Sequence, residues 1–434
     1  MNPTPFQTAL LDKILKQKLP LELPEEFIHP YYEGASILNI PTSIVKHLSG
    51  STFGHASLLP EIEAAFFPKQ YQHIALVLVD GLGYDWLYEY LQEEGQRPEA
   101  LRFWHHILSD AVIAPLTSIS PSTTAAALST FWTGRPPVAH GILGYEVWLK
   151  EFGILANMIL HSPAPARGAV GSIYAAGFDP TTFLPVETIG PHLKAHGVKT
   201  RSFQHISIVD SGLSSMLDAE SQRLPYKTVT DMWFNFEEAL LAEPQQSSYN
   251  WLYWGDHDGL GHRWGVSHPR LHNQFEAFGL EMMRALERLR RENLKDTLIL
   301  ITADHGHLVT PRNPRYDLLN YPDMMDLLAM DPSGDNRLPY FYASTDNLEQ
   351  VKHRFYQHWT EEEFEFIPSQ AALEAGLFGT GEQYQRAKDR IGDWLVLPKG
   401  TAYLWWSGRP DPLHGRHGGL SRTEMLVPLI AIEV

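Results

Sequence analysis

Short runs of apolar residues that end at polar or glycine-rich turns recur along the chain. The clearest is His73–Val79, which is followed directly by Asp80-Gly81. Three other runs have the same character, namely Asn250–Trp254, Thr297–Thr302 and Met425–Val434. Unbroken apolar runs of this length are typical of strands that are buried on both faces of a parallel sheet. We therefore expect these four segments to be strands of one sheet.

Helical patterns separate these apolar runs. One extends from about Pro269 to Asn293, ahead of the Thr297–Thr302 run, and another starts near Tyr84. Alternation of buried strands with helices predicts a doubly wound α/β/α sandwich.

The region from about Tyr316 to Leu397 breaks this alternation. It combines strand-like Arg337–Tyr342, an acidic amphipathic stretch from Asn347 to Glu363, and strand-like Phe364–Ile367. No Gly/Ser-rich linker separates it from the rest of the chain. We expect one large domain over residues 1–434 with a small α+β cap inserted at 316–397, and separate domains are the alternative.

The charge balance excludes one class of partner. Of the 434 residues, 34 are Lys or Arg and 51 are Asp or Glu, so the formal net charge is −17. Such a chain repels polyanions unless positive charge is local or is supplied by a bound metal. Duplex nucleic acid is therefore not an expected partner.

The absence of cysteine narrows the chemistry further. Disulfides, thiolate metal ligands and cysteine nucleophiles are excluded, so a metal would have to be held by carboxylates and by some of the 21 histidines. The N-terminal residues lack the pattern of a signal peptide, and no apolar run approaches the length of a membrane helix. We expect a cytoplasmic protein without membrane spans.

Two candidate metal-binding positions follow directly after predicted strands. Asp80 comes after the first run, and Asp304 with His305 comes after Thr297–Thr302. Open α/β sheets bind their ligands at the carboxyl ends of strands, which favours a functional role for these residues. The alternative is that Asp80 caps the helix near Tyr84, and that Asp304 caps a turn.

A third cluster lies in the segment Gly255–His262. Asp258 and His262 are four residues apart, so a helical conformation would place both on one face. Asp256 is a competing ligand at this stage, and His257 is expected at the surface. Alternatively, the segment is a hydrated glycine-rich loop.

Hydroxyl residues and late histidines complete the candidates. Pro121–Leu128 leads from Ser122, Thr123 and Thr124 into a helix-forming run, and a helix N-terminus binds phosphate readily, although a plain cap would use the same residues. His414 and His417 lie among glycines near the C-terminus.

Together the clusters supply enough ligands for two metal ions, which can clamp the attacking and leaving oxygens in a displacement at phosphorus. The joint pattern indicates phosphoryl-transfer chemistry.

The motifs resemble those of the alkaline phosphatase superfamily and, within it, of the type I phosphodiesterase and nucleotide pyrophosphatase family. The resemblance covers Ile74–Trp86, Ser120–Gly144, Trp251–Gly265, Leu298–His307 and His417 to the C-terminus, in the family's order. It implies an alkaline-phosphatase-type fold and a two-zinc site, with Mn²⁺ as another metal that such a site could take.

The resemblance also implies how the ligands divide. One zinc would be held by Asp80, Asp304, His305 and Thr124, and the other by Asp258, His262 and His417. The family's Asp-x-x-Gly-His pattern selects Asp258 over Asp256. His417 matches the family's late His-Gly and is preferred to His414 because Gly-Gly-Leu-Ser follows it.

The nucleophile is placed by Thr133-Gly134 and His140-Gly141-Ile142, which are similar to the family's Thr-Gly and His-Gly-Ile. This register implies that Thr124 forms a covalent phospho-threonine intermediate, with Thr123 as the nearest competitor. The implied activity is hydrolysis of a phosphodiester or pyrophosphate bond in a small-molecule phosphate ester, nucleotides included. A phosphomonoesterase or phosphomutase on the same scaffold is the alternative.

One position departs from the resemblance. Many nucleotide pyrophosphatases carry asparagine where this chain has Ala127, so nucleotide specificity does not follow from the motif. Backbone N–H groups of the helix start, Asn157 and Arg135 are the candidates to bind phosphate instead.

Overall fold

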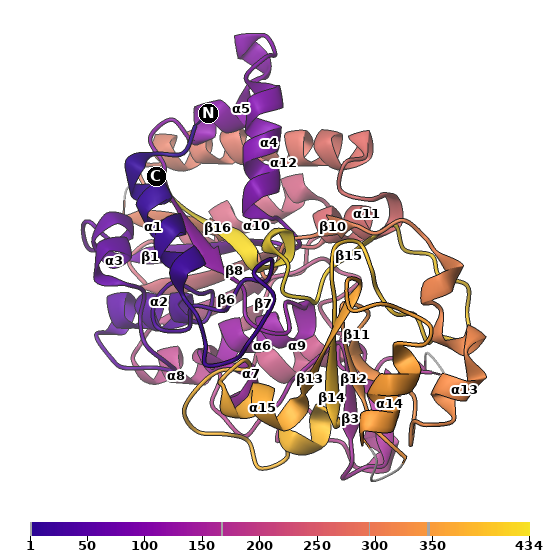
Figure 1. Ribbon diagram of the computed structural model, residues 1–434. Coiled ribbons are helices and arrows are strands. Elements are labelled where there is room, and N and C mark those ends of the chain that lie inside the picture. The colour runs from indigo at the N-terminus through magenta and orange to yellow at the C-terminus, as the bar shows by residue number, and fades with distance from the viewer. Residues whose placement is uncertain (1, 166–167, 295, 345–347) are drawn as a thin grey trace.

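The computed structural model describes residues 2–165, 168–294, 296–344 and 348–434, and its centre is a seven-stranded sheet (Figure 1). The strand order is β2-β16-β9-β1-β8-β6-β7. The strands are β1 (His73–Val79), β2 (Val112–Thr117), β6 (Lys199–Phe203), β7 (Gln222–Arg223), β8 (Ser248–Trp254), β9 (Thr297–Thr302) and β16 (Leu426–Glu433). All four strands expected from the apolar runs are therefore present in one sheet.

Strand β16 runs against its neighbours. It pairs antiparallel with both β2 and β9, whereas β1, β6, β7, β8 and β9 pair in parallel. The sequence predicted this strand but as part of a parallel sheet. An apolar run reports burial on both faces and carries no information about strand direction, so only the pairing could reveal the difference.

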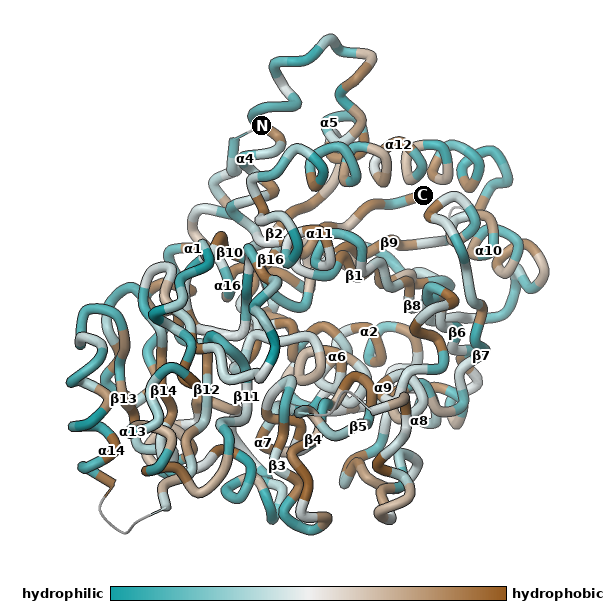
Figure 2. The backbone as a smooth tube through the Cα atoms, turned by 90° about the vertical axis from the view of Figure 1, so that its right-hand side faces the viewer, coloured by the Kyte–Doolittle hydropathy of each residue, from teal (hydrophilic) through white to brown (hydrophobic). Residues whose placement is uncertain are grey.

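Helices cover both faces of the central sheet (Figure 2). On one side lie α4 (Tyr84–Glu94), α5 (Phe103–Ile107), α10 (Val229–Ala242) and α12 (Pro269–Arg291), and on the other α2 (Asn39–Ser49), α6 (Thr124–Thr133) and α8 (Ile189–Ala195). The remaining α-helices are α1 (Pro5–Lys16), α3 (Pro60–Phe66), α7 (Pro137–His140), α9 (Gly212–Leu217), α11 (Asp256–Trp264), α13 (Pro322–Met325), α14 (Leu348–Phe355), α15 (Ser369–Glu374) and α16 (Arg422–Met425).

The long helix α12 shows why the helices pack onto the central sheet. Its buried residues recur at spacings of three and four, among them Leu271, Phe275, Phe278 and Met282, so they form one apolar stripe. Pro269 occupies the first turn, where its missing N–H costs no hydrogen bond.

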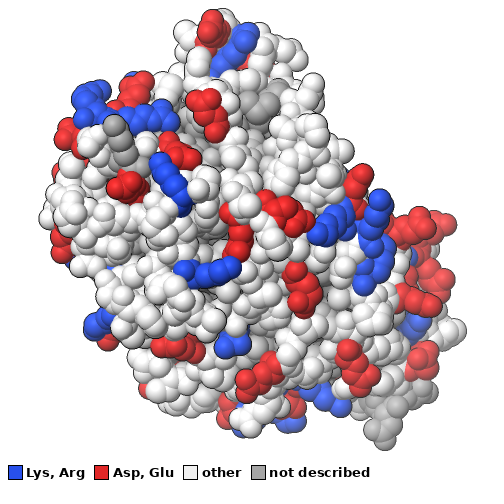
Figure 3. All heavy atoms as spheres, turned by 90° about the vertical axis from the view of Figure 1, so that its left-hand side faces the viewer, with Lys and Arg blue, Asp and Glu red and all other residues white. Residues whose placement is uncertain are grey.

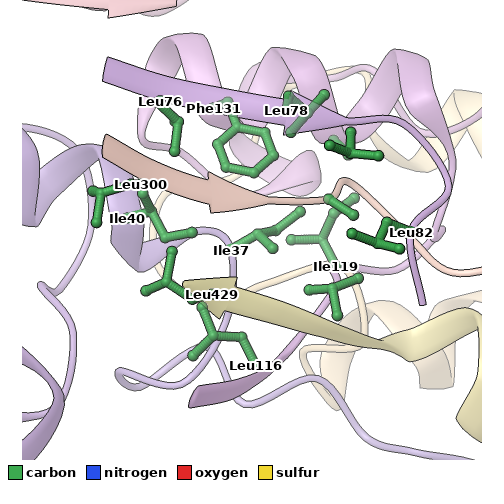
Figure 4. Packing of buried hydrophobic residues seen from close by; sticks show 14 of the residues in the cluster. Ile37, Ile40, Leu76, Leu78, Leu82, Leu116, Ile119, Phe131, Leu300 and Leu429 are labelled. Carbon is green, nitrogen blue, oxygen red and sulfur yellow. The ribbon is translucent and has the colours of Figure 1, made fainter. Parts of the chain in front are cut away.

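The core lies between the sheet and the helices on either face. Figure 4 shows Leu76, Leu300 and Leu429 of three adjacent strands close to Phe131 of α6 and to Ile40 of α2. These five side chains are completely buried. Burying one large apolar side chain stabilises a fold by about 1.5–3 kcal/mol, so this layer holds the strand ends in fixed positions.

A second, antiparallel sheet lies beside the first, with the order β13-β14-β12-β11-β3-β4-β5. Its strands are β3 (Glu146–Leu149), β4 (Ile154–Asn157), β5 (Ser162–Pro163), β11 (Ser333–Asp335), β12 (Leu338–Phe341), β13 (Phe364–Pro368) and β14 (Trp394–Pro398). Residues expected to form a cap thus supply β11–β14, and they pair through Gly334 and Glu146 with strands from much earlier in the chain.

The amphipathic stretch in this region is shorter than expected. Its helix, α14, ends at Phe355, and Asn347, the first residue of the predicted stretch, lies outside the described residues. The division into one domain with an insertion stays a prediction.

A buried ion pair ties the second sheet to the segment that leads into β16. Arg337 donates from Nε to Glu424 Oε1 at 3.1 Å and from Nη2 to Oε2 at 2.9 Å, and both side chains are 0% exposed. The Gly419 N–H donates to the same carboxylate at 2.9 Å. Burial alone would raise the pKa of Glu424, but Arg337 and these hydrogen bonds hold that pKa below its usual value.

No helix within the described ranges is long and apolar enough to cross a membrane. On the face shown in Figure 3, basic side chains lie among acidic ones, and the described residues form no broad basic surface there.

Candidate active site

The candidate residues meet at the carboxyl ends of β1, β8 and β9. These strands are adjacent and parallel, so their ends lie at one edge of the sheet. Asp80 follows β1, and Asp304 with His305 follows β9. Helix α11, which begins just after β8, carries Asp258 and His262. Thr124 is the first residue of α6, and His417 follows the short strand β15 (Gly415–Arg416), so segments from across the chain complete the cluster.

One set of ligand atoms surrounds His305 Nε2. This nitrogen lies 3.2 Å from Thr124 Oγ1, 3.3 Å from Asp304 Oδ2 and 3.5 Å from Asp80 Oδ1. Ligands that bind one zinc tetrahedrally with bonds of about 2.0–2.1 Å are separated from one another by about 3.3 Å. The three distances from His305 Nε2 therefore lie near the separation of two ligands on one small divalent ion.

A second set surrounds His262 Nε2. It lies 3.4 Å from Asp258 Oδ2 and 3.2 Å from His417 Nε2, and His417 Nε2 is 3.7 Å from Asp258 Oδ1. Asp258 also lies within ligand distance of Asp80 and His305, so its carboxylate stands between the two sets. The helical spacing of Asp258 and His262 that the sequence suggested is confirmed by α11.

Unpartnered buried oxygens indicate that cations belong here. Asp80 Oδ1, Asp304 Oδ2 and Asp258 Oδ1 are buried, and none has a hydrogen-bond partner among the residues that the structure describes. Burial, and then the carboxylates of Asp304 and Asp258, raise the pKa of Asp80 well above its usual value. Buried carboxylates in such proximity are costly unless a metal compensates their charge. The donor set therefore fits two divalent ions.

The three histidines are held in the orientation that a metal ligand requires. The Nδ1 atoms of His262, His305 and His417 lie 2.9, 3.0 and 3.1 Å from the carbonyl oxygens of Gly415, Gly306 and Ser122. A carbonyl can only accept, so each Nδ1 carries the proton and each Nε2 keeps its lone pair. Burial, with neighbouring His305, also lowers the pKa of His417 well below its usual value, which keeps that ring neutral.

Thr123 and Thr124 have different surroundings. Thr123 is completely buried, and its hydroxyl donates to Asp335 Oδ1 at 2.8 Å. Burial raises the pKa of Asp335 to about 7. Thr124 instead directs its hydroxyl to His305 and lines the main cavity of the site. Only Thr124 of this pair lies with the candidate metal ligands.

The structure also distinguishes Asp258 from Asp256 and His417 from His414. Asp256 Oδ2 accepts from Trp254 Nε1 and from Gln274 Nε2, each at 3.2 Å, on the other side of α11 from Asp258. His414 is joined to the site through its backbone, because its N–H donates to the His262 carbonyl.

His257 was expected at the surface, and this expectation is wrong. The residue is only 1% exposed, and its ring packs edge-on against Trp86 with 4.6 Å between ring centroids. Helix α11 packs against α12, so the face of α11 opposite the solvent is buried as well as the face at the ligands.

Three residues at the site were missed by the sequence analysis. The Tyr253 hydroxyl donates to Asp80, Asp335 receives the Thr123 hydroxyl, and His307 Nε2 lies 3.3 Å from Asp258 Oδ1. His307 follows His305 by two residues, which was the only available signal. Tyr253 and Asp335 come from a predicted strand and from the predicted cap, and nothing in their local sequence marks them.

A cavity of about 420 Å³ opens from the ligands between the two sheets. Aromatic side chains line it at Tyr145, Trp405 and Trp406, together with Glu146, Asp335 and Arg409. The cavity can therefore hold an organic group attached to a phosphate at Thr124.

The candidates for phosphate binding differ in position. Asn157 lines the cavity, with its Oδ1 accepting the N–H groups of Ile159 and Leu160 at 3.0 and 2.9 Å. Arg135 is exposed and follows the C-terminal end of α6, opposite to Thr124, so it is not placed to bind phosphate there. Ala127 is fully buried.

Comparison with known proteins agrees with this geometry. A sequence profile described as type I phosphodiesterase / nucleotide pyrophosphatase matches residues 74–420. The chain belongs to this family, whose members are hydrolases, and its fold is of the alkaline phosphatase type. No curated protein sequence matches the chain.

Solved structures share the fold at low sequence identity. Murine ectonucleotide pyrophosphatase/phosphodiesterase 5 is 16% identical, with 83% of this chain and 87% of that chain covered and a TM-score of 0.60. An inactive form of the murine protein, in complex with AMP, matches with 15% identity, the same coverage and a TM-score of 0.60. Phosphonoacetate hydrolase from Sinorhizobium meliloti 1021, in complex with phosphonoformate, is 16% identical, with 84% and 92% covered and a TM-score of 0.56.

Proposed function

We propose that the protein is a two-metal phosphodiesterase or pyrophosphatase in which Thr124 is the nucleophile. The observation that carries the proposal is the convergence of Thr124 Oγ1 with His305 Nε2, 3.2 Å away, at the centre of a set of metal-competent side chains. One ion would be held by Asp80, Asp304, His305 and Thr124. Asp258, His262 and His417 would hold the other.

When bound, two divalent ions would lower the pKa of the attacking hydroxyl and neutralise charge that develops on the phosphate oxygens. Thr124 forms the new Oγ–phosphorus bond while the bond from phosphorus to the leaving oxygen breaks. The hydroxyl proton ends on the leaving oxygen, so the leaving group departs as an alcohol or phosphate, and the second ester group of a diester stays on the phosphoryl group that Thr124 carries. Water then cleaves the phospho-threonine, which restores the hydroxyl and releases the second product. Backbone N–H groups in the first turn of α6 are oriented to bind a phosphate oxygen during both steps.

The substrate that this site supports is a small-molecule phosphate ester with a planar or apolar leaving group. Tyr145, Trp405 and Trp406 offer flat apolar surface beside Thr124. The AMP complex of the murine relative supports a nucleotide-like ester in particular.

The first prediction concerns metal content. Protein purified without chelator is expected to carry two divalent ions per chain, with zinc preferred because the ligands are imidazoles and carboxylates at tetrahedral spacing. Elemental analysis of desalted protein measures the ratio. A ratio of one or less after incubation with excess zinc would refute the two-metal site.

The second prediction concerns the charge of the substrate. The carboxylate-bearing Glu146 lines the cavity, and Arg416, which also lines it, is paired with Asp411. A monoester brings nearly one more negative charge than a diester, so it meets more repulsion here. We expect kcat/KM for bis-p-nitrophenyl phosphate to exceed that for p-nitrophenyl phosphate by at least about tenfold, a difference of about 1.4 kcal/mol in transition-state binding.

Both esters release the same chromophore, so they can be compared at equal pH and zinc concentration. Preference for the monoester would instead indicate a phosphomonoesterase, in which Arg409 at the cavity would bind the extra charge.

A further inference from the structure

His307 is a buried imidazole for which the proposed reaction has no use. Its side chain is 1% exposed, and neither ring nitrogen has a hydrogen-bond partner within the described part of the chain. Burying a polar group without a partner costs free energy, so a hydrophobic residue would be the cheaper choice for a purely structural position.

The surrounding backbone is fitted to this ring. A Cβ atom added at Gly415 would lie 2.7 Å from His307 Cε1 and 2.9 Å from its Nδ1. One added at Gly261 would lie 3.3 Å from its Nε2. These two glycines belong to the segments that carry His262 and His417, so the ring is packed between the two segments that present ligands.

The ring lies behind the Asp258 carboxylate. Its Nε2 is 3.3 Å from Asp258 Oδ1, whereas its centroid is 4.7 Å from that of His262 and 5.5 Å from that of His417. The tight group of ligand atoms contains Asp258, His262 and His417 without His307. Metal-binding carboxylates commonly receive a hydrogen bond from an outer residue, which fixes their orientation.

We propose that His307 is a positioning residue that holds Asp258 for metal binding. A proton on His307 Nε2 would be donated to Asp258 Oδ1, 3.3 Å away, while Asp258 Oδ2 lies 3.4 Å from His262 Nε2. This inference rests on the proposed function, since the ion that benefits is the one held by Asp258, His262 and His417.

The test compares two substitutions of the same ring. His307→Leu keeps an apolar volume and removes the donor, whereas His307→Gln can place an amide N–H near the position of Nε2. Zinc affinity is measured for the purified chains by competition with a chromophoric chelator. We expect His307→Leu to weaken the binding of one of the two ions by about 10–100-fold, and His307→Gln to recover most of that loss.

Two controls distinguish a role in positioning Asp258 from an overall loss of stability. His414→Leu removes a half-exposed imidazole from the same glycine-rich segment, and it should leave both zinc affinities within about threefold of the unsubstituted chain. Thermal unfolding of the metal-free proteins reports any structural effect. Equal zinc affinity in His307→Leu and the unsubstituted chain would overturn the inference. Equal losses in the Leu and Gln variants, with equal destabilisation of their metal-free forms, would overturn it in favour of a packing role.

Failure of the proposed function gives a different result. In that case the unsubstituted chain itself would bind fewer than two ions or would leave phosphate esters intact. Two bound ions and turnover in the unsubstituted chain, with unchanged affinity in His307→Leu, would remove only the inference about His307.

Discussion

Thr124→Ala is expected to lower kcat for phosphodiester cleavage by at least about 10³-fold, because the hydroxyl that forms the covalent intermediate is gone. Six carboxylate and imidazole side chains remain as proposed ligands, so at least one metal ion should stay bound. The measurements are steady-state rates with a chromogenic diester and elemental analysis of the same protein sample. Loss of turnover with metal retained would assign the hydroxyl to the chemical step rather than to the integrity of the site.

Thr123→Val is the matched control. It has nearly the same shape and removes a hydroxyl that bonds Asp335, so its effect on kcat should stay within about tenfold. Thr124→Ser keeps a hydroxyl and should retain measurable turnover. If Thr123→Val abolished turnover while Thr124→Ala retained it, the nucleophile would be displaced by one residue.

Trapping gives independent support for the same residue. Acid quenching during turnover of the diester, followed by peptide mass analysis, should find a phosphoryl group that keeps its second ester substituent on the peptide that contains Thr124. The same treatment of Thr124→Ala should find none, and phosphate on any other residue would contradict the assignment.

Glu424→Gln is expected to lower the free energy of unfolding by about 3–5 kcal/mol, because it leaves the buried Arg337 charge without a counter-charge. Both side chains of this pair are 0% exposed, and they join the second sheet to the segment between His417 and β16. Urea denaturation monitored by tryptophan fluorescence measures the change. Metal binding at the proposed site should weaken in parallel, since the N–H of Gly419, two residues beyond His417, donates to the same carboxylate.

The pH dependence of this contribution follows from the direction of the pKa. The folded-state pKa of Glu424 lies below its usual value, so the stabilisation is fully present above the unfolded pKa of about 4.3. It is lost as the pH falls through the lower folded-state pKa. The stability difference between the original chain and Glu424→Gln should therefore shrink in acid.

Glu61→Gln serves as the control for charge removal in general. Glu61 pairs with Lys13 at 2.9 Å, but these side chains are 46% and 44% exposed, so the change should cost less than about 1 kcal/mol. If both variants lost the same free energy of unfolding, burial of the Arg337–Glu424 pair would add nothing to its stabilising effect.

The sequence by itself determined four of the seven strands of the central sheet and the metal-competent residues that follow them. His73–Val79 and Thr297–Thr302 form strands within the bounds that their apolar runs predicted. This was possible because a strand that is buried on both faces is an unbroken run of apolar residues, which can be recognised in the sequence. The carboxyl ends of adjacent parallel strands also lie at one edge of the sheet. The spacing of Asp258 and His262 also predicted that both side chains lie on one face of a helix, since four residues make about one helical turn.

Only the tertiary structure decided what depends on segments far apart in the chain. The direction of β16, the burial of His257, and the pairing of β11 with β3 through Gly334 and Glu146 have no local signal. The same holds for the Thr123–Asp335 hydrogen bond and for His307 behind Asp258, where the partners are separated in sequence and meet through packing. The local pattern of apolar residues shows how a segment is buried. Which segments become its neighbours depends on how the whole chain packs around one core.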